Sequence, residues 1–235
     1  LRLRRIIGPL KLHMTSRRGA LKCNTNIESV IYGDPKIIEY VKAKYDASIL
    51  YVDVAIGVLL DFLKAHDLYD DSLLLLTADH GESLGEHNLF FTHKGLYDVT
   101  IHVPLILKHP SLSRGRVVHE IVQHVDILPT ILDLLNARVF TTNLEEMDGT
   151  SLIPVVDGTS IIRDFAYIEE WRPKLKDLSS YRRALRSKKF KLITSLDKTV
   201  IELYDLERDP EEKINIASRE TETVKFLSSI LDSYV

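Results

Sequence analysis

One stretch of the chain restricts the fold more than any other. Residues 73–77 read LLLLT, and a short continuous apolar run of this kind is typical of a strand buried on both faces of a sheet. The run stops abruptly, and Asp79, His80 and Gly81 follow within four positions. Ligand-binding groups of α/β sheets lie beyond the carboxyl ends of the strands. The sequence therefore predicts a buried strand that presents an acid and an imidazole at one edge of a sheet.

The segments on either side of this strand predict layers of helix and sheet. Apolar residues recur every three or four positions over residues 38–63, which predicts a long helix that begins at Asp34-Pro35 and ends near His66. A second apolar run covers residues 103–108, and another helix is predicted to open at residue 126. This alternation favours an α/β fold with a mostly parallel sheet and flanking helices.

The C-terminal part has a different pattern. Short strand-like pieces with tight polar breaks lie at residues 165–169, 181–186, 190–194 and 200–205, and an amphipathic helix follows at residues 221–234. We expect a small C-terminal antiparallel sheet with a helix. The predicted division is a basic, disordered leader at residues 1–27, part of an α/β domain at residues 28–160, and a small α+β subdomain at residues 161–235.

The distribution of charge along the chain restricts the classes of partner that it could bind. The formal net charge is −3, but residues 1–27 hold seven Lys or Arg and no acid. A nucleic-acid-binding arm is one reading. The lack of aromatic residues among these charges favours a displaced leader, so no nucleic-acid partner is expected. Cys23 is the single cysteine, no apolar run approaches a membrane span of about 20 residues, and the start is a poor signal peptide, which together favour a cytoplasmic protein.

Asp79 and His80 are the first candidate site residues. In a continuing strand they would point to opposite faces, but at a strand end followed by Gly81 both can turn toward one ion. A carboxylate with an imidazole suits a divalent metal. Two ligands are too few, because zinc takes about four donors and calcium six to eight. The alternative is an acid that caps a turn beside an exposed histidine, and the surrounding apolar and polar pattern favours the metal.

The loop that carries His93 and Lys94 could fold back over that metal. An imidazole and an ammonium there would bind an anionic group and stabilise charge on a leaving oxygen. A solvated surface pair is an equally good reading of these two residues. Glu82 and Glu86 read as an ordinary polar face, and His87 is a weaker ligand candidate than His80. Four further histidines beside apolar runs read as structural: His102, His109, His119 and His124.

Taken in order, the motifs resemble the sulfatases of the alkaline phosphatase superfamily. The resemblance rests on TADHGESLGEH at residues 77–87, HKGLYD at 93–98, HVPLIL at 102–107, VQHVDILPTIL at 122–132, DGTSL at 148–152, LRSKKFKLI at 185–193 and LYDLERDPEE at 203–212. It covers the chain from about residue 36 to the end. It implies a partial alkaline phosphatase-like fold and the activity of a sulfuric ester hydrolase.

The resemblance also implies roles for individual residues. Asp79 and His80 would be ligands of a divalent metal, usually calcium, with manganese and zinc as alternatives. Lys94 would contact the sulfate and the leaving-group oxygen, and His93 is the alternative for that role. The expected substrate is a small-molecule or carbohydrate sulfate ester.

The sequence departs from the family at the nucleophile. Members carry a Cys/Ser-x-Pro-x-Arg motif whose Cys or Ser becomes formylglycine, but Cys23 is followed by Asn-Thr-Asn-Ile and no serine fits the motif. The paired N-terminal aspartates have no counterpart in residues 1–27, and His13 is only a weak candidate for the sulfate-contacting histidine. We therefore expect an incomplete, C-terminal portion of a sulfatase that binds metal weakly.

Three functions stay open at this point. The first is metal-dependent cleavage of sulfate esters. The second is hydrolysis of phosphodiesters or phosphonate monoesters within the same superfamily, because the same residues suit both. The third is a non-catalytic fragment or a subunit that needs a partner, either the missing N-terminal half or a second copy bound through exposed apolar edges.

Overall fold

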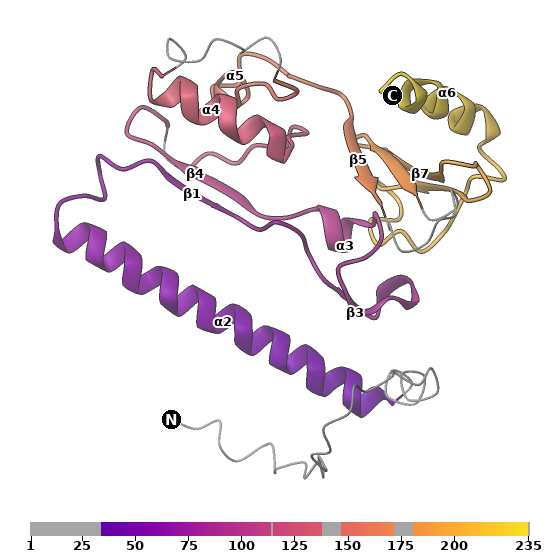
Figure 1. Cartoon of the computed structure of the whole chain (residues 1–235), viewed down its shortest axis with the longest axis horizontal. Helices are drawn as coiled ribbons and strands as arrows, with labels where there is room; N and C mark the ends of the chain where they lie inside the picture. The colour runs from indigo at the N-terminus through magenta and orange to yellow at the C-terminus, as the bar shows by residue number, and fades with distance from the viewer. Residues whose placement is uncertain (1–33, 114, 138–146, 172–180, 235) are drawn as a thin grey trace. The chain divides into compact units, whose positions relative to one another are not determined.

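The computed structural model describes residues 34–113, 115–137, 147–171 and 181–234. The chain divides into two compact units, residues 1–41 and 42–235. Of the first unit only residues 34–41 are described, and they belong to the start of a helix. The predicted leader, with His13 and Cys23, therefore lies outside the described residues. Figure 1 shows the order of the elements along the chain.

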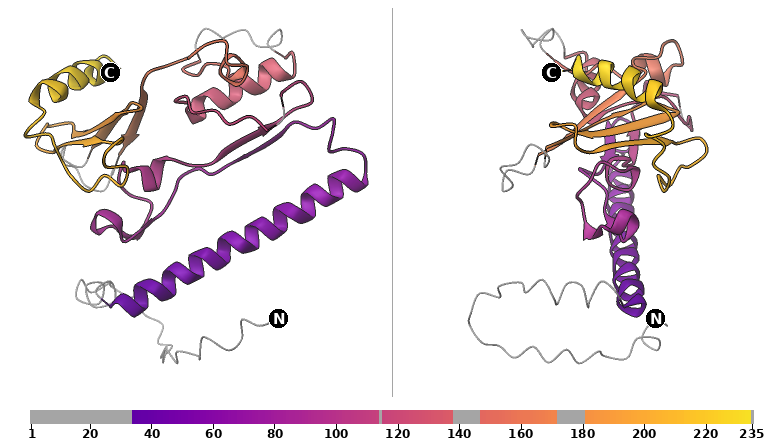
Figure 2. Two further views of the ribbon diagram at one scale, coloured as in Figure 1. Left: turned by 180° about the vertical axis from the view of Figure 1, so that it is seen from behind. Right: turned by 90° about the vertical axis from the view of Figure 1, so that its right-hand side faces the viewer.

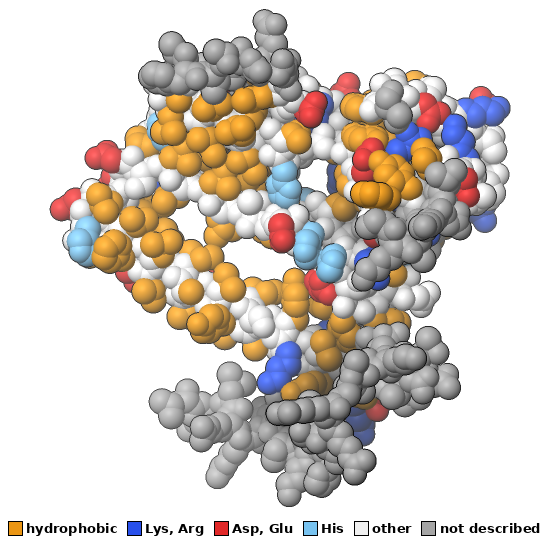
Figure 3. Space-filling view, viewed as in Figure 1, with side chains coloured by type: hydrophobic (Ala, Val, Ile, Leu, Met, Phe, Trp, Pro, Cys, Tyr) orange, Lys and Arg blue, Asp and Glu red, His pale blue; other side chains and the backbone are white. Residues whose placement is uncertain are grey.

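The long helix α2 spans Pro35–Ala65, as the sequence predicts. Asp34 caps its start, because Oδ1 accepts a hydrogen bond from the backbone N–H of Lys36 at 2.9 Å. No residue of α2 is buried, and Figure 3 shows its hydrophobic side chains at the surface. Within the described ranges, no helix combines the length and apolarity that crossing a membrane requires.

Strands β1 (Leu74–Thr77) and β4 (Leu105–Lys108) form where the two apolar runs predict them, but β1 is not the buried strand expected, because its three leucines are half-buried and Thr77 is exposed. They pair with each other in antiparallel fashion, with Leu74 opposite Lys108, so the expected parallel pairing is corrected for these strands. The segment that connects β1 to β4 explains why the two strands are antiparallel. Between residues 77 and 105 the chain forms only a hairpin and one turn of helix, and a parallel pairing would need a crossover back to the start of β1.

The connection between β1 and β4 is a compact hairpin followed by a short helix. Strands β2 (Ser83–Leu84) and β3 (Phe90–Thr92) pair in antiparallel fashion around the 3-10 turn η2 (Glu86–Asn88). Gly85 enters this turn with φ of 125°, a conformation that side chains rarely tolerate. The helix α3 (Asp98–Ile101) then leads back into β4.

The next element opens at the position that the sequence predicts. The turn η3 (His124–Asp126) runs directly into helix α4 (Ile127–Leu134), and a short helix α5 (Ile153–Val156) follows. Asp126 is fully buried and closes a capping box, because its Oδ2 accepts the backbone N–H of Gln123 at 2.7 Å. The start of α4 is thereby fixed by a side chain that no solvent reaches.

The C-terminal part is a four-stranded antiparallel sheet in the order β5-β6-β7-β8. Its strands are β5 (Ala166–Glu170), β6 (Arg182–Arg186), β7 (Phe190–Ser195) and β8 (Ile201–Asp205), and helix α6 (Thr221–Asp232) follows. Figure 2 shows α6 lying along the sheet. The α/β class and the small antiparallel sheet with its helix are confirmed, whereas the domain boundary near residue 160 stays a prediction.

Both faces of this sheet are covered by apolar side chains. Successive residues of a strand point to opposite faces, so each strand contributes side chains to both. The face toward α6 holds Leu185, Leu192, Leu203, Leu227 and Leu231. The opposite face holds Ala184, Ile193, Tyr204, Leu206, Leu96 and Tyr97. The last two residues come from the segment just before α3. The loop that carries His93 and Lys94 is therefore continuous with the core of the C-terminal sheet.

Candidate functional site

Asp79 and His80 lie directly beyond β1, where the backbone leaves the sheet. Their side chains are 87% and 45% exposed. Asp79 Oδ1 accepts the backbone N–H of His80 at 2.9 Å, and Asp79 Oδ2 lies 3.6 Å from His80 Nε2. The strand end thus presents a carboxylate oxygen and an imidazole nitrogen side by side.

One hydrogen bond orients the His80 ring and selects its neutral tautomer. Its Nδ1 lies 2.9 Å from the carbonyl oxygen of Gly81. A carbonyl oxygen only accepts hydrogen bonds, so Nδ1 carries a proton, and in the neutral ring the lone pair is on Nε2. This is the arrangement in which a neutral histidine can bind a metal ion.

One buried residue, Thr100, fixes the backbone on both sides of the site. Its carbonyl oxygen accepts the backbone N–H of Gly81 at 2.8 Å, and its hydroxyl donates to the carbonyl oxygen of Gly95 at 2.8 Å. A Cβ at residue 81 would lie 2.1 Å from the Val99 carbonyl oxygen, so only glycine fits there. The end of β1 and the loop that carries Lys94 are therefore held by the same residue.

That loop brings His93 onto His80. The two imidazole rings stack with centroids 4.6 Å apart and an interplanar angle of 30°. Lys94 is exposed and follows directly, with its backbone N–H 3.4 Å from Thr92 Oγ1. The structure therefore brings His93 to the strand end, with Lys94 as the adjoining residue. The roles assigned to them by resemblance stay predictions.

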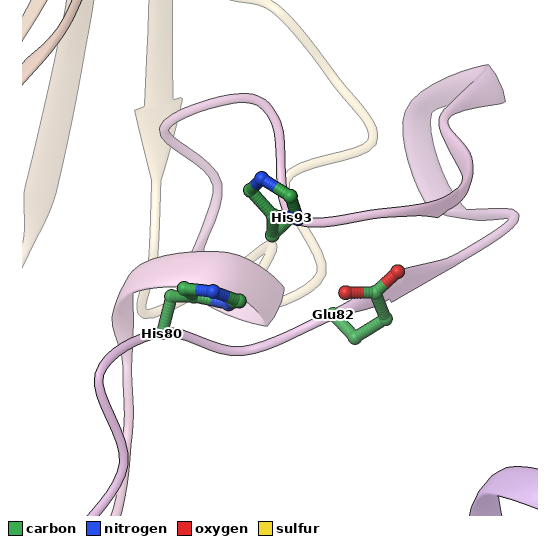
Figure 4. A group of neighbouring side chains, drawn as sticks. All are labelled: His80, Glu82 and His93. Atoms are coloured by element: carbon green, nitrogen blue, oxygen red, sulfur yellow. The ribbon is translucent and has the colours of Figure 1, made fainter.

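Glu82 belongs to the same group, although the sequence pattern read as a plain polar face. One ligand atom each from His80, Glu82 and His93 lie within 4.8 Å of one another. Figure 4 shows the three side chains, two on the segment that leaves β1 and one on the returning loop. His80 and Glu82 are two positions apart, and in extended chain such residues share a side. This two-residue spacing is the sequence feature that could have placed Glu82 in the group with His80.

Glu86 and His87 serve the hairpin instead. Glu86 Oε2 accepts the backbone N–H of Leu84 at 2.6 Å. Burial raises the pKa of Glu86, but backbone hydrogen bonds to its carboxylate outweigh that effect and lower it. The His87 ring stacks on Tyr97, with centroids 3.6 Å apart, and burial lowers the pKa of His87. Neither side chain is part of the group formed by His80, Glu82 and His93.

The loop is anchored to the C-terminal sheet through Asp98. Arg186 Nη2 lies 2.9 Å from Asp98 Oδ2, and the fully buried Lys191 places its Nζ 2.5 Å from Asp98 Oδ1 and 2.5 Å from Glu212 Oε1. Glu212 Oε2 accepts the Asp98 backbone N–H at 2.6 Å. Burial would raise the pKa of Asp98, but Arg186 and Lys191 outweigh it and lower the pKa to about 2. No pattern in the sequence indicates this network, because its residues are far apart along the chain.

Comparison with known proteins identifies the family. The family model for sulfatases matches residues 13–137, and the model for the C-terminal part of N-sulphoglucosamine sulphohydrolase matches residues 85–232. The chain belongs to the sulfatase family. Arylsulfatase K of Gallus gallus is 31% identical over 84% of this chain, and choline-sulfatase of Rhizobium meliloti (strain 1021) is 32% identical over 74% of it.

Solved structures agree with this assignment. A protein in complex with its substrate D-glucosamine-2-N,6-O-disulfate matches 89% of this sulfatase chain, with a TM-score of 0.74 and 25% identity. A phosphonate monoester hydrolase from Silicibacter pomeroyi matches 84% of it, with a TM-score of 0.73 and 27% identity. The chain spans 37% of arylsulfatase K, 32% of choline-sulfatase and 44% and 41% of these two structures.

The sulfatase family implies a divalent metal, and the strand end fits one. Metal–donor distances of about 2.0–2.6 Å allow two neighbouring donors on one ion to lie about 3–4 Å apart. Asp79 Oδ2 and His80 Nε2, at 3.6 Å, meet that condition without rearrangement. In Figure 3 histidine and acidic side chains gather at the surface of the face shown. The described residues thus fit part of a metal coordination sphere.

Proposed function

We propose that this chain carries the metal-binding and anion-binding residues of a sulfatase that cleaves sulfate esters. The observation that supports this most directly is the stacking of His93 on His80, 4.6 Å between ring centroids. It lays His93, the residue before Lys94, against His80, which follows Asp79 beyond the end of β1. Cleavage of a sulfate ester needs ligands for a metal cation, which an acid and an imidazole can supply. It also needs a positive charge for the anionic sulfate group, which a lysine can supply.

In this proposal Asp79 and His80 hold the divalent ion. Asp79 supplies an oxygen, and His80 supplies Nε2 because Nδ1 is committed to the Gly81 carbonyl at 2.9 Å. We expect calcium, as the family resemblance implies, with manganese and zinc as the alternatives. When bound, such an ion would act as a Lewis acid that polarises a substrate oxygen.

Lys94 would bind the sulfate group and stabilise negative charge on the leaving oxygen, and His93 would assist it or replace it. Both side chains are exposed at the strand end, so a substrate could reach them. The Cys/Ser-x-Pro-x-Arg pattern does not occur in the 235 residues, so the proposal assigns no nucleophile to them. Asp79, His80 and Lys94 would act on a substrate that is attacked by a group outside this sequence.

The proposed substrate class is a small-molecule or carbohydrate sulfate ester. Support comes from similar proteins: one relative, of Bacteroides thetaiotaomicron, is named delta 4,5-hexuronate-2-O-sulfatase, and one similar structure contains a sulfated glucosamine. Hydrolysis of phosphonate monoesters is the second candidate, because of the similarity to the Silicibacter pomeroyi enzyme.

The test is to express the whole reading frame that contains these residues and to measure turnover of 4-nitrophenyl sulfate and 4-nitrophenyl phenylphosphonate. We expect a higher kcat/KM for the sulfate. Asp79→Asn and Lys94→Met should each lower it by about 100- to 1000-fold, the usual effect of removing a group that stabilises developing charge.

Lys189→Met is the matched control, because Lys189 is also exposed but its Nζ lies 5.1 Å from the Phe190 ring, on the C-terminal sheet. Its kcat/KM should stay within about twofold of the wild type. A preference for the phosphonate would favour the second candidate. Absence of turnover on both substrates would favour a non-catalytic chain, and full activity in Lys94→Met would refute the role of Lys94.

A further inference from the structure

A pocket of about 420 Å³ shares no residue with the site beyond β1. It lies between residues 116–120, which follow β4, and residues 155–161, at the end of α5 and after it. Its polar lining includes Arg116, His119 and Thr159, none of which takes part in the proposed function. We propose that this pocket binds a small organic anion, a carboxylate or a sulfate ester on a group about the size of one sugar ring. Such a site would work independently of the sulfatase chemistry.

Arg116 supplies the positive charge of the pocket. A Cβ at residue 158 would lie 2.1 Å from Arg116 Nη2, so the guanidinium rests against the bare backbone of Gly158, whose φ is +70°. Arg163 and Arg186 each bind an aspartate, but Arg116 pairs with no acid of the described ranges. Its fork of N–H donors is therefore free to bind two oxygens of a carboxylate or sulfate group.

The end of α5 beside Arg116 does not use this guanidinium as a cap. The carbonyl oxygens of Ile153, Pro154 and Val155 accept backbone N–H groups from residues 157–159, at 2.9, 2.9 and 3.1 Å. A basic side chain near a helix C-terminus often binds these carbonyl groups. Here the turn itself satisfies them, which leaves the donors of Arg116 uncommitted.

The acid among the described lining residues, Glu120, is already paired. Lys188 Nζ lies 2.5 Å from Glu120 Oε2, so the negative charge of Glu120 is offset at the edge of the pocket. The charge of Arg116 has no such counterpart. The pocket therefore presents a net positive charge, which attracts an anion and repels a cation.

The size and the walls of the pocket favour an organic ligand over a bare ion. Pockets for small molecules commonly measure about 300–1,000 Å³, and this one falls within that range. Val155 and Ile161 give it an apolar wall, which suits the C–H groups of a sugar ring. The Thr159 hydroxyl donates to the Pro154 carbonyl oxygen at 3.1 Å, so its lone pairs stay available to hydroxyl groups of a ligand.

The test is isothermal titration of the purified chain with sodium glucuronate and with glucose 6-sulfate, in EDTA so that no divalent ion occupies the strand end. Both anions should bind, and uncharged glucose should bind at least about tenfold more weakly. Arg116→Met should weaken binding of both anions by about 10- to 100-fold, the usual effect of losing hydrogen bonds to a charged group. Gly158→Ala should weaken it too, because the added methyl group would displace Arg116 Nη2.

Two controls separate this pocket from general attraction to positive charge and from the strand end. Arg219→Met removes another exposed arginine, on the segment before α6, and it should bind both anions like the wild type. Lys94→Met removes the cation next to His93 and should also bind them like the wild type. Circular dichroism of each variant checks the fold.

The proposal is overturned if folded Arg116→Met binds both anions as tightly as the wild type, or if the wild type binds neither anion better than glucose. It is also overturned if Lys94→Met loses binding while Arg116→Met keeps it, since the anion would then lie at the strand end. These results leave the proposed sulfatase function untouched, because that function is measured by ester turnover in variants of Asp79 and Lys94. Arg116→Met should leave that turnover unchanged.

Discussion

Asp126 shows how much a single carboxylate can organise in this chain. It is fully buried, and its Oδ1 accepts the Thr150 backbone N–H at 2.9 Å and Arg163 Nη2 at 2.6 Å. Its Oδ2 accepts the Gln123 backbone N–H at 2.7 Å and also pairs with Arg163 Nη1. The Asp126 carboxylate therefore joins three segments: the start of α4, the loop before α5 and the chain that leads to β5.

Asp126→Asn should destabilise the protein by about 3–5 kcal/mol, the usual cost of breaking a buried ion pair by removing one partner. The variant leaves the Arg163 guanidinium, which is 13% exposed, without its counter-charge. Urea unfolding followed by circular dichroism measures the effect. Asp157→Asn, at an exposed position, should change the unfolding free energy by less than about 0.5 kcal/mol. Equal stability of the two variants would contradict the role of Asp126.

At the scale of elements, the short helix α3 is held to the C-terminal sheet by charge as well as by packing. Leu96 and Tyr97 enter the sheet core, and Asp98 meets Lys191 and Arg186 at its edge. The raised pKa of Glu212 has burial as its main cause, against the lowering effect of the Lys191 ammonium. The segment that carries Lys94 is thus positioned by residues about 90 positions later in the sequence.

Protonation of Asp98 should weaken this attachment at low pH. The pKa of Asp98 falls from 3.8 to about 2 on folding, so its contribution to stability, about 2 kcal/mol, is complete above pH 4 and is lost as the pH falls toward 2. Urea unfolding of the wild type and of Asp98→Asn between pH 2 and 5 measures it. The difference between the two should shrink as the pH falls. A difference that is constant with pH would refute the assignment.

The sequence predicted most elements, and the misses have physical causes. The strands β5 to β8 were recognisable because short apolar alternations and polar breaks are local properties. The direction of β4 relative to β1 was not, because it depends on the path of the connection. Lys191 reads as a solvent-facing strand residue, since its counter-charges Asp98 and Glu212 are distant in sequence. Of the candidate site, the sequence singled out Asp79, His80, His93 and Lys94, whose roles stay predictions, and Glu82 was read as a polar face.

At the scale of the whole molecule, the apolar surface of α2 is the feature that most affects behaviour in solution. Tyr51 is 76% exposed, Val58 66% and Leu50 58%, and no residue of the helix is buried. Contiguous exposed apolar surface of this kind promotes association. In a purified sample the available partner is a second copy of the chain.

We expect the purified chain to self-associate as its concentration rises, and Leu50→Glu with Val58→Glu should reduce this by placing charge on the apolar surface of α2. Sedimentation velocity over a concentration series measures it. Phe226→Glu is the control, because Phe226 is 61% exposed but lies on α6, and it should associate like the wild type. A monomeric wild type over the whole series would contradict the prediction.

The two hydrogen bonds of Thr100 have a consequence for how much change the β2–β3 hairpin can tolerate. Gly81 and Gly95, each bound to Thr100 at 2.8 Å, bracket the β2–β3 hairpin. The hairpin can therefore grow, shrink or change its side chains between these two points while the distance from Asp79 to Lys94 stays nearly constant. Insertions and deletions in this hairpin should therefore be tolerated without moving the charged groups at either end of it.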